Sequence, residues 1–139
     1  MELQVGVKVF LKNPEGKYLL LRRAVDRLAH QTTFQGKWDI PGGRMNPGTT
    51  LMENLAREVL EETGLVMTST PSLVAAQDIL KWTDHHVVRL TYVGEVSGNP
   101  RLSEEHTEYR WFTFDEIKTL ENLDSYFKAL LDVGIVTEK

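Results

Sequence analysis

The pattern of apolar and polar residues predicts several short strands and one long helix. Residues 5–11 first alternate and then become continuously apolar, as a strand does when it enters a core. A polar turn at 13–16 separates them from residues 17–23, where a run of apolar side chains predicts a second strand. The same criteria predict further strands at residues 38–40, 72–82, 87–96 and 109–114.

The long helix is predicted at residues 51–63, between two clear end signals. Thr50 and Glu53 form a capping box at its start, and Gly64 stands where a left-handed C-terminal cap is expected. At about 100° per residue, the apolar side chains cover roughly half of the helix circumference, which predicts a wide buried face. These side chains are Leu51, Met52, Leu55, Ala56, Val59 and Leu60.

The rest of the chain predicts two shorter helices and two polar connections. A second capping box at residues 113–116 opens a short helix, and residues 124–133 predict the last helix. Residues 24–37 form a long polar connection of the kind that often carries function, and residues 83–86 predict an exposed turn. Strands, a helix, more strands and then helices are the element order of an α+β or α/β fold.

Composition limits the class of protein without indicating an activity. With 139 residues, of which 41% are hydrophobic and 26% charged, the chain fits a single domain, 1–139, with a full core. The absence of cysteine excludes disulfides and thiolate metal ligands. A formal net charge of −4 without a basic tract argues against nucleic-acid binding. Because we find no export signal and no apolar run of transmembrane length, we expect a cytoplasmic protein that does not contact membranes.

Three carboxylates lie near the C-terminal end of the predicted long helix, where the helix dipole disfavours negative charge. Glu58 and Glu62 stand one turn apart, and Glu62 falls at the edge of the apolar face, where it is poorly hydrated. Glu61 widens the cluster. Because these like charges repel, we expect a divalent cation to compensate them. A solvated acidic helix end is the simpler alternative, but the glycine-rich loop directly before the helix favours a metal site.

The run from residue 43 to residue 65 resembles the Nudix (MutT-like) box, Gly-x5-Glu-x7-Arg-Glu-apolar-x-Glu-Glu-x-Gly-apolar. The chain departs from this pattern at one position, because Thr49 stands where the family has its first Glu. Agreement at the other positions makes this a specific signal. The matching residues are Gly43, Arg57, Glu58, Val59, Glu61, Glu62, Gly64 and Leu65.

The resemblance implies a fold and a cofactor. The implied fold is the Nudix α/β/α sandwich with a mixed central sheet, and the implied cofactor is Mg²⁺ or Mn²⁺. In the family, the acids that match Glu58, Glu61 and Glu62 bind the ion, and the carbonyl that matches Gly43 often joins them.

The resemblance also gives the departure at residue 49 a meaning. In the family, the arginine that matches Arg57 pairs with the first Glu of the box and holds the loop against the helix. Thr49 cannot form this ion pair. Glu53, four residues before Arg57, is placed to substitute, although the capping box also uses it. The departure therefore concerns the rigidity of the loop more than the binding of metal.

The implied reaction is the hydrolysis of a nucleoside diphosphate that is linked to a further group. A cation-bound water attacks phosphorus, a carboxylate accepts its proton, and the bond to the bridging oxygen breaks. Several family members add a carboxylate from a loop late in the chain, and Glu105 is the positional match, with Glu104 and Glu108 as alternatives. An ordinary solvated loop is the competing interpretation of this stretch. The catalytic candidates are Glu61, Glu62, Arg57 and Glu105.

Substrate contacts are expected from cations and aromatic rings near the box. In similar proteins an arginine at the end of the second strand reaches phosphate, and a guanidinium suits this role. Aromatic rings can stack on a base, although rings at strand positions usually pack in cores. The neighbouring Glu105 would raise the pKa of His106 and give it a role at the site, but an ordinary solvated side chain is the interpretation we favour. The substrate-binding candidates are Arg23, Arg44, Trp38 and Tyr109, with Arg27, His30 and Trp82 as further alternatives.

We expect a small nucleotide as substrate and a monomer or homodimer as the assembly. The substrate classes that the resemblance leaves open are nucleoside triphosphates (oxidised or not), ADP-ribose or other nucleotide sugars, and dinucleoside polyphosphates. The small size of the chain favours triphosphates, while residues 101–111 look like the corresponding region of diadenosine tetraphosphate hydrolases. A non-catalytic nucleotide-binding module is the alternative that Thr49 favours and the three intact acids oppose.

Overall fold

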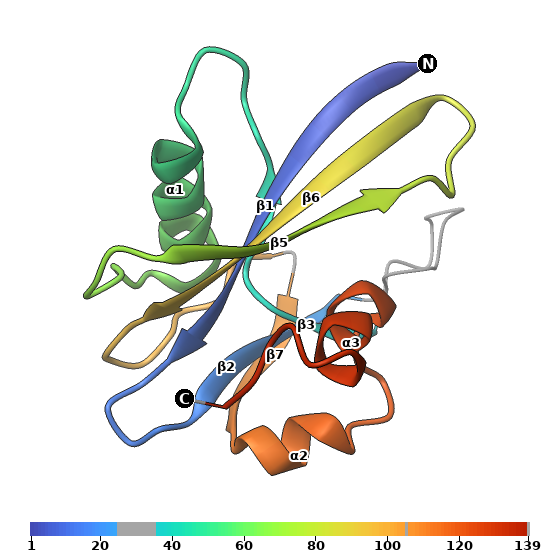
Figure 1. Ribbon diagram of the computed structural model, residues 1–139. Helices are drawn as coiled ribbons and strands as arrows, with labels where there is room; N and C mark the ends of the chain where they lie inside the picture. Colours follow the sequence, from blue (N-terminus) through green and yellow to red (C-terminus); the bar gives the residue numbers. More distant parts are fainter. Residues whose placement is uncertain (25–35, 105, 139) are drawn as a thin grey trace.

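The computed structural model describes residues 1–24, 36–104 and 106–138. Within these ranges a seven-stranded mixed sheet lies between helices, with α1 on one side and α2 and α3 on the other (Figure 1). The strands are β1 (Glu2–Lys12), β2 (Tyr18–Arg23), β3 (Trp38–Asp39), β4 (Gly42–Arg44), β5 (Ser72–Ile79), β6 (His85–Glu95) and β7 (His106–Phe112). The helices are α1 (Leu51–Thr63), α2 (Phe114–Lys118) and α3 (Ser125–Asp132).

Strand β1 organises the sheet. It pairs in parallel with β6 along its whole length, and β5 adds an antiparallel strand outside β6. On its other side β1 pairs antiparallel with β4 through residues 6–8 and then with β2 at Lys12. Strand β2 continues the sheet through antiparallel pairing with β3 and β7. The short strand β4 is thereby held directly against the centre of the sheet.

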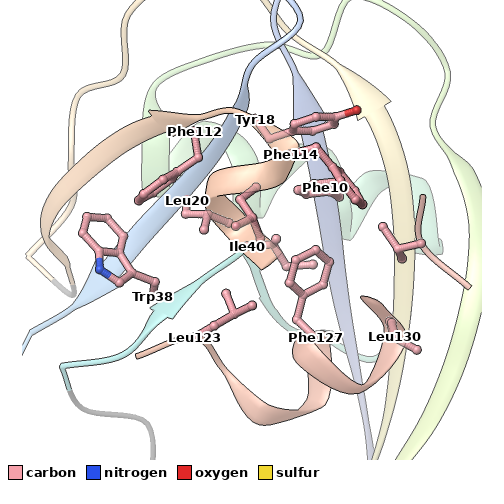
Figure 2. Close-up of a cluster of buried hydrophobic side chains, with 12 residues drawn as sticks. Phe10, Tyr18, Leu20, Trp38, Ile40, Phe112, Phe114, Leu123, Phe127 and Leu130 are labelled. Carbon is pink, nitrogen blue, oxygen red and sulfur yellow. The ribbon is translucent and has the colours of Figure 1, made fainter. Parts of the chain in front are cut away.

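Alternate side chains of the central strands enter two separate cores. Val7, Val9 and Leu11 of β1 pack with Leu55 and Val59 of α1 on one face. On the other face, residues such as Phe10, Tyr18 and Phe127 form an aromatic-rich cluster beneath α2 and α3 (Figure 2). The rings of Phe10 and Tyr18 stack there with their centroids 4.1 Å apart. This arrangement confirms the predicted α/β/α sandwich with a mixed central sheet.

The ends of α1 are confirmed, but its buried face differs from the prediction. Thr50 Oγ1 accepts a hydrogen bond from Glu53 N, the Glu53 carboxylate accepts one from Thr50 N, and Gly64 has a φ of 72°. Met52, Ala56 and Leu60 are exposed, whereas polar side chains on the opposite edge of the apolar stripe are buried with Leu55 and Val59. The helix is therefore rotated so that its polar edge faces β4 and the preceding loop. These buried polar residues are Asn54, Glu62 and Thr63.

Three further predictions about elements were wrong. The segment Gly42–Arg44 was expected to be loop, but it forms β4 because its backbone pairs with β1. His85 and His86 were expected in an exposed turn, but they begin β6 and lie opposite Glu2 and Leu3 of β1. The predicted strand at 72–82 ends at Ile79. In the first two cases, pairing with the distant strand β1, which local sequence does not reveal, decided the boundary.

Some predicted residues lie outside the part of the chain that the structure describes. These are Glu105, Arg27 and His30. None of the helices in the described ranges is long and apolar enough to cross a lipid bilayer.

Candidate functional site

The glycine-rich segment lies close to α1 where Gly43 faces Glu58. A Cβ atom added at Gly43 would lie only 2.6 Å from Glu58 Oε2, so the carboxylate occupies the space that any other residue would fill. At Gly42, with a φ of 141°, an added Cβ would collide with the carbonyl oxygen of Val7 in β1. The two glycines therefore allow β4 to lie between β1 and the Glu58 carboxylate.

Glu62, one turn further along α1, lies beneath the same segment. Only 4% of this residue is exposed, and its two carboxylate oxygens lie 3.3 and 3.4 Å from the backbone N of Gly42, which donates to them. His106 Nε2 of β7 is 3.8 Å from Glu62 Oε2. Glu62 is thus a buried carboxylate held under the glycine-rich backbone, as expected for an acid at the apolar edge of the helix.

Arg57 lies between the other two acids of the predicted cluster. Its Nη1 is 3.1 Å from Glu58 Oε1 and 3.2 Å from Glu61 Oε2. The side chain of Glu61 is largely exposed, whereas that of Glu58 is mostly buried. Among the described residues, no three Asp, Glu, His or Cys side chains converge closely enough to hold one ion. The acids instead spread around the helix, so a cation bound at Glu58 needs further oxygen ligands from backbone, water or substrate.

Glu53 does not substitute for the missing first Glu of the box. Its carboxylate accepts from Thr50 N in the capping box, and no ion pair joins it to Arg57 within the described residues. Arg57 Nη2 donates instead to Asn54 Oδ1 at 3.1 Å. The sequence interpretation missed Asn54, although a polar residue next to Leu55 on the buried stripe was a usable signal.

A cavity of about 390 Å³ opens beside Glu58. Residues from α1 and from strands β1 to β6 line it, together with the connections before α1 and after β5. Its lining holds five basic side chains and only two carboxylates, although the whole chain is net negative. Such a surface attracts an anionic ligand. The basic residues are Lys8, Arg23, Arg44, Arg57 and Arg89, and the acids are Asp39 and Glu58.

A buried network of charges forms one wall of this cavity. Arg89 of β6 is 4% exposed, and its guanidinium lies 2.9 Å from Asp39 Oδ2 and 2.6 Å from Asp124 Oδ2. Lys8 Nζ lies 3.1 Å from Asp39 Oδ2. Burial opposes the charge of Arg89, but Asp39 and Asp124 outweigh it and raise the pKa of the guanidinium. Likewise, burial works against ionisation of Asp39, but Arg89 and Lys8 hold its pKa below the usual value.

The sequence interpretation missed this network. Lys8 and Arg89 each stand in an otherwise apolar strand, and a charged residue at such a position signals a buried partner. The partners themselves, Asp39 in β3 and Asp124 before α3, are far away in the chain and only the fold brings them together.

The structure separates the predicted substrate-binding residues into two groups. Arg23 and Arg44 line the cavity. Trp38 is buried in the core against Phe112, with ring centroids 5.3 Å apart, and Tyr109 is a surface residue of β7; neither lines the cavity.

Trp82, an alternative in the sequence interpretation, does line the cavity. Its ring stacks on His85 with centroids 4.4 Å apart, and the Arg44 guanidinium carbon lies 5.2 Å from the Trp82 ring centroid. This places an aromatic surface next to a cation at the side of the cavity.

In the late acidic stretch, Glu108 forms an ion pair, and the expected solvation of His106 was wrong. Glu108 lies 3.0 Å from Arg22 Nη1 and is tied to β2 by this ion pair. His106 is buried and not solvated, and its pKa is lowered to about 4, first by burial and then by the positive charges of Arg23 and Lys8. The charge of Asp39 acts in the opposite direction and raises the pKa of His106, but it is the smallest of these effects.

Comparisons with known proteins identify one family. The model of the NUDIX domain matches residues 2–131. A protein named nucleoside triphosphatase NudI from Enterobacter sp. (strain 638) is 30% identical over 116 residues, covering 76% of this chain and 79% of the relative. An asymmetrical bis(5'-nucleosyl)-tetraphosphatase from Rattus norvegicus is 30% identical over 120 residues, covering 83% and 76%. The crystal structure of a MutT protein from Methanosarcina mazei Go1 superposes with a TM-score of 0.80 at 34% identity, covering 95% and 92%.

Proposed function

The chain belongs to the NUDIX family, whose enzymes hydrolyse phosphoanhydride bonds, and we propose that it is a divalent-metal-dependent hydrolase of nucleoside triphosphates. The observation that carries the proposal is the close approach of Gly43 to Glu58 at the edge of a cavity lined by basic side chains. Oxygen ligands and phosphate-binding cations meet there, as metal-assisted phosphate hydrolysis requires.

The residues at this place fit Mg²⁺ or Mn²⁺. The guanidinium of Arg57 already lies between Glu58 and Glu61, which shows that these carboxylates favour positive charge between them. Mg²⁺ commonly uses one or two protein carboxylates and completes its coordination shell with water and substrate phosphate. Three carboxylates that converge on one point are therefore not required. We assign the ion to Glu58 and the carbonyl of Gly43, with Glu61 and Glu62 as the further acids.

The bound ion would neutralise charge on the phosphate oxygens and acidify a water. The side chains of the protein have the remaining tasks. Arg23 and Arg44 bind the phosphate chain through charge-assisted hydrogen bonds. Glu61 or Glu62 accepts the proton of the attacking water, while Arg57 orients the acids around it. The ring of Trp82 stacks on the base at the side of the cavity.

The names of the relatives support two of the substrate classes. One relative is named as a nucleoside triphosphatase and another as a bis(5'-nucleosyl)-tetraphosphatase. Both kinds of substrate present a chain of phosphates to a basic cavity. We favour triphosphates and keep dinucleoside polyphosphates as the second class to test.

The test is an assay of purified protein with Mg²⁺ and a panel of nucleoside triphosphates (one of them oxidised), ADP-ribose and diadenosine tetraphosphate. The control is Glu62→Gln, whose amide oxygen can still accept from Gly42 N while the charge is removed. We expect triphosphate turnover in the wild type and a loss of about 100-fold or more in the variant.

Two results would contradict the proposal. Tight nucleotide binding without turnover of any compound would make the protein a binding module. Full activity of Glu62→Gln would show that the acidic site is placed on the wrong residues.

A further inference from the structure

The loop that carries residues 46–50 is tied to α1 without an ion pair. Thr49 replaces the carboxylate that would bind Arg57, and its short side chain does not reach the guanidinium. Thr49 Oγ1 instead donates to the carbonyl of Asn46 at 2.9 Å and accepts from Asn54 Nδ2 at 2.5 Å. The loop therefore meets α1 at Asn54.

Asn54 uses all of its hydrogen-bonding capacity at this junction. Its Nδ2 donates to Thr49 Oγ1 and to the carbonyl of Thr50 at 2.7 Å. Its Oδ1 accepts from Asn46 N at 2.9 Å and from Arg57 Nη2 at 3.1 Å. An amide offers two donors and two acceptor positions, so no aliphatic or acidic side chain of this size can replace it. The residue is 1% exposed, which makes each of these bonds costly to lose.

The same amide connects the loop to the acids of the proposed site. Arg57, which Asn54 holds through Nη2, contacts Glu58 and Glu61 through Nη1. Glu58 in turn fills the space over Gly43. A continuous set of contacts thus runs from Thr49 through Asn54 and Arg57 to the carboxylate at the cavity.

We propose that Asn54 is a positioning residue that, together with Thr49, replaces the missing loop-to-arginine ion pair and fixes Arg57 and Glu58 for cation binding. The part that concerns cation binding rests on the function proposed above. Asn54 touches neither substrate nor metal in this role, and it acts only by orienting Arg57 and the loop.

The test compares four variants of this junction and one control variant with the wild type. Asn54→Ala removes the connection between the loop and Arg57, and Thr49→Val removes only the hydrogen bond between residues 49 and 54. Thr49→Glu adds a carboxylate to the loop. In the double variant Thr49→Glu/Asn54→Ala, the smaller side chain at residue 54 leaves room for that carboxylate to reach Arg57. Affinity for Mn²⁺ alone is measured by electron paramagnetic resonance of the free ion. Hydrogen exchange of the Asn46 amide reports on the loop without metal or substrate.

We expect Asn54→Ala to weaken Mn²⁺ binding about tenfold, as the loss of an outer-shell partner commonly does. Asn46 should lose its exchange protection in the same variant, and Thr49→Val should show both effects more weakly. The double variant should recover most of the Mn²⁺ affinity, while Thr49→Glu alone should change it little because Asn54 already occupies the gap. Gln77→Ala, which removes a partly buried amide of β5 that bonds to the carbonyl of Tyr126 and does not line the cavity, is the control and should leave Mn²⁺ affinity unchanged.

The proposal is overturned if folded Asn54→Ala binds Mn²⁺ like the wild type. It is also overturned if the double variant shows no recovery, or if Gln77→Ala weakens binding equally, because Asn54 would then only stabilise the fold. Failure of the proposed function looks different: the wild type would bind Mn²⁺ without hydrolysing any nucleotide, and the comparison between variants would still decide the role of Asn54.

Discussion

At the scale of single residues, the site depends on two glutamate side chains that pack against the backbone of two glycines. Glu58 lies where a Cβ of residue 43 would be, and Glu62 lies directly under the amide of Gly42. A glycine is needed at residue 43 because a side chain would have no room there. The backbone conformation does not require it, because the φ of Gly43 is not in the left-handed region. A substitution there therefore changes the acid and leaves the backbone conformation accessible.

Gly43→Ala should displace the Glu58 carboxylate and weaken Mn²⁺ binding by about tenfold, with overpacking costing roughly 1–3 kcal/mol of stability. Titration with Mn²⁺ and urea unfolding measure the two effects. Gly16→Ala is the matched control, because its strain at a φ of 81° lies in a remote turn with open space around it. Equal Mn²⁺ affinity in Gly43→Ala and the wild type would contradict the packing argument.

His106 predicts a pH dependence of stability in metal-free protein. Its folded-state pKa of about 4 lies below the ordinary value of 6.5, so the unfolded chain binds the proton more readily. This contribution to stability is complete above pH 6.5 and is lost as the pH falls toward 4, by about 3 kcal/mol. Urea unfolding of the wild type and His106→Gln at pH 7 and pH 4.5 measures it. A loss of the same size in His106→Gln would assign the effect to other groups.

At the scale of elements, the helix ends could be predicted and the helix faces could not. The capping boxes of α1 and α2 are short sequence patterns whose hydrogen bonds form within a few residues, and both are present. The buried side of α1 depends on β4 and the loop, which lie against its polar edge. Asn54 and Glu62 are buried for this reason, while Met52 and Leu60 are exposed.

The caps of α2 and α3 should differ in strength. Asp124 caps α3 by accepting from Phe127 N and also binds the buried Arg89, whereas Thr113 caps α2 at the surface. Asp124→Ala should lower the free energy of unfolding by about 3 kcal/mol or more, because it removes one partner of a buried charge. Thr113→Ala should lower it by about 1 kcal/mol. Urea unfolding compares them, and equal losses would mean that the Arg89 network contributes nothing.

At the scale of the whole molecule, the fold turns a net negative chain into a protein with a basic cavity. The lining comes from α1, strands β1 to β6 and the connections before α1 and after β5, which are spread over more than half of the sequence. The acids are largely on other surfaces or paired inside the cavity wall. Net charge alone therefore says little about which ligand this protein binds.

The position of the aromatic rings predicts which of them contacts the base. Trp82→Ala should raise the KM for the nucleotide about tenfold with little change in kcat, because stacking on a base contributes roughly 1–3 kcal/mol. Tyr109→Ala, on a strand away from the cavity lining, should leave both parameters unchanged. Steady-state kinetics of the two variants is the measurement. An effect at Tyr109 and none at Trp82 would place the base beside β7 and away from this cavity.

Trp82 and Trp38 differ in burial in a way that the sequence did not predict. Both are aromatic residues near polar segments, and local sequence does not tell which ring is covered by other elements. Trp38 is covered by Leu123 and Phe112, which come from the last third of the chain, and it belongs to the core. The same reason explains His106, whose solvation depends on elements far from it in sequence.

The sequence by itself determined the family, the α/β/α fold and the ends of α1, because these follow from a motif and from periodicities within one segment. It also predicted Arg57, Glu58, Glu61 and Glu62 as site residues, because their spacing on one helix fixes their positions relative to each other. The tertiary structure alone decided which acid faces the cavity, that Asn54 and not Glu53 holds Arg57, and that Lys8, Asp39, Arg89 and Asp124 form one network. These are contacts between residues brought together by strand pairing and helix packing, and the free energy that selects them belongs to the folded molecule and not to any single segment.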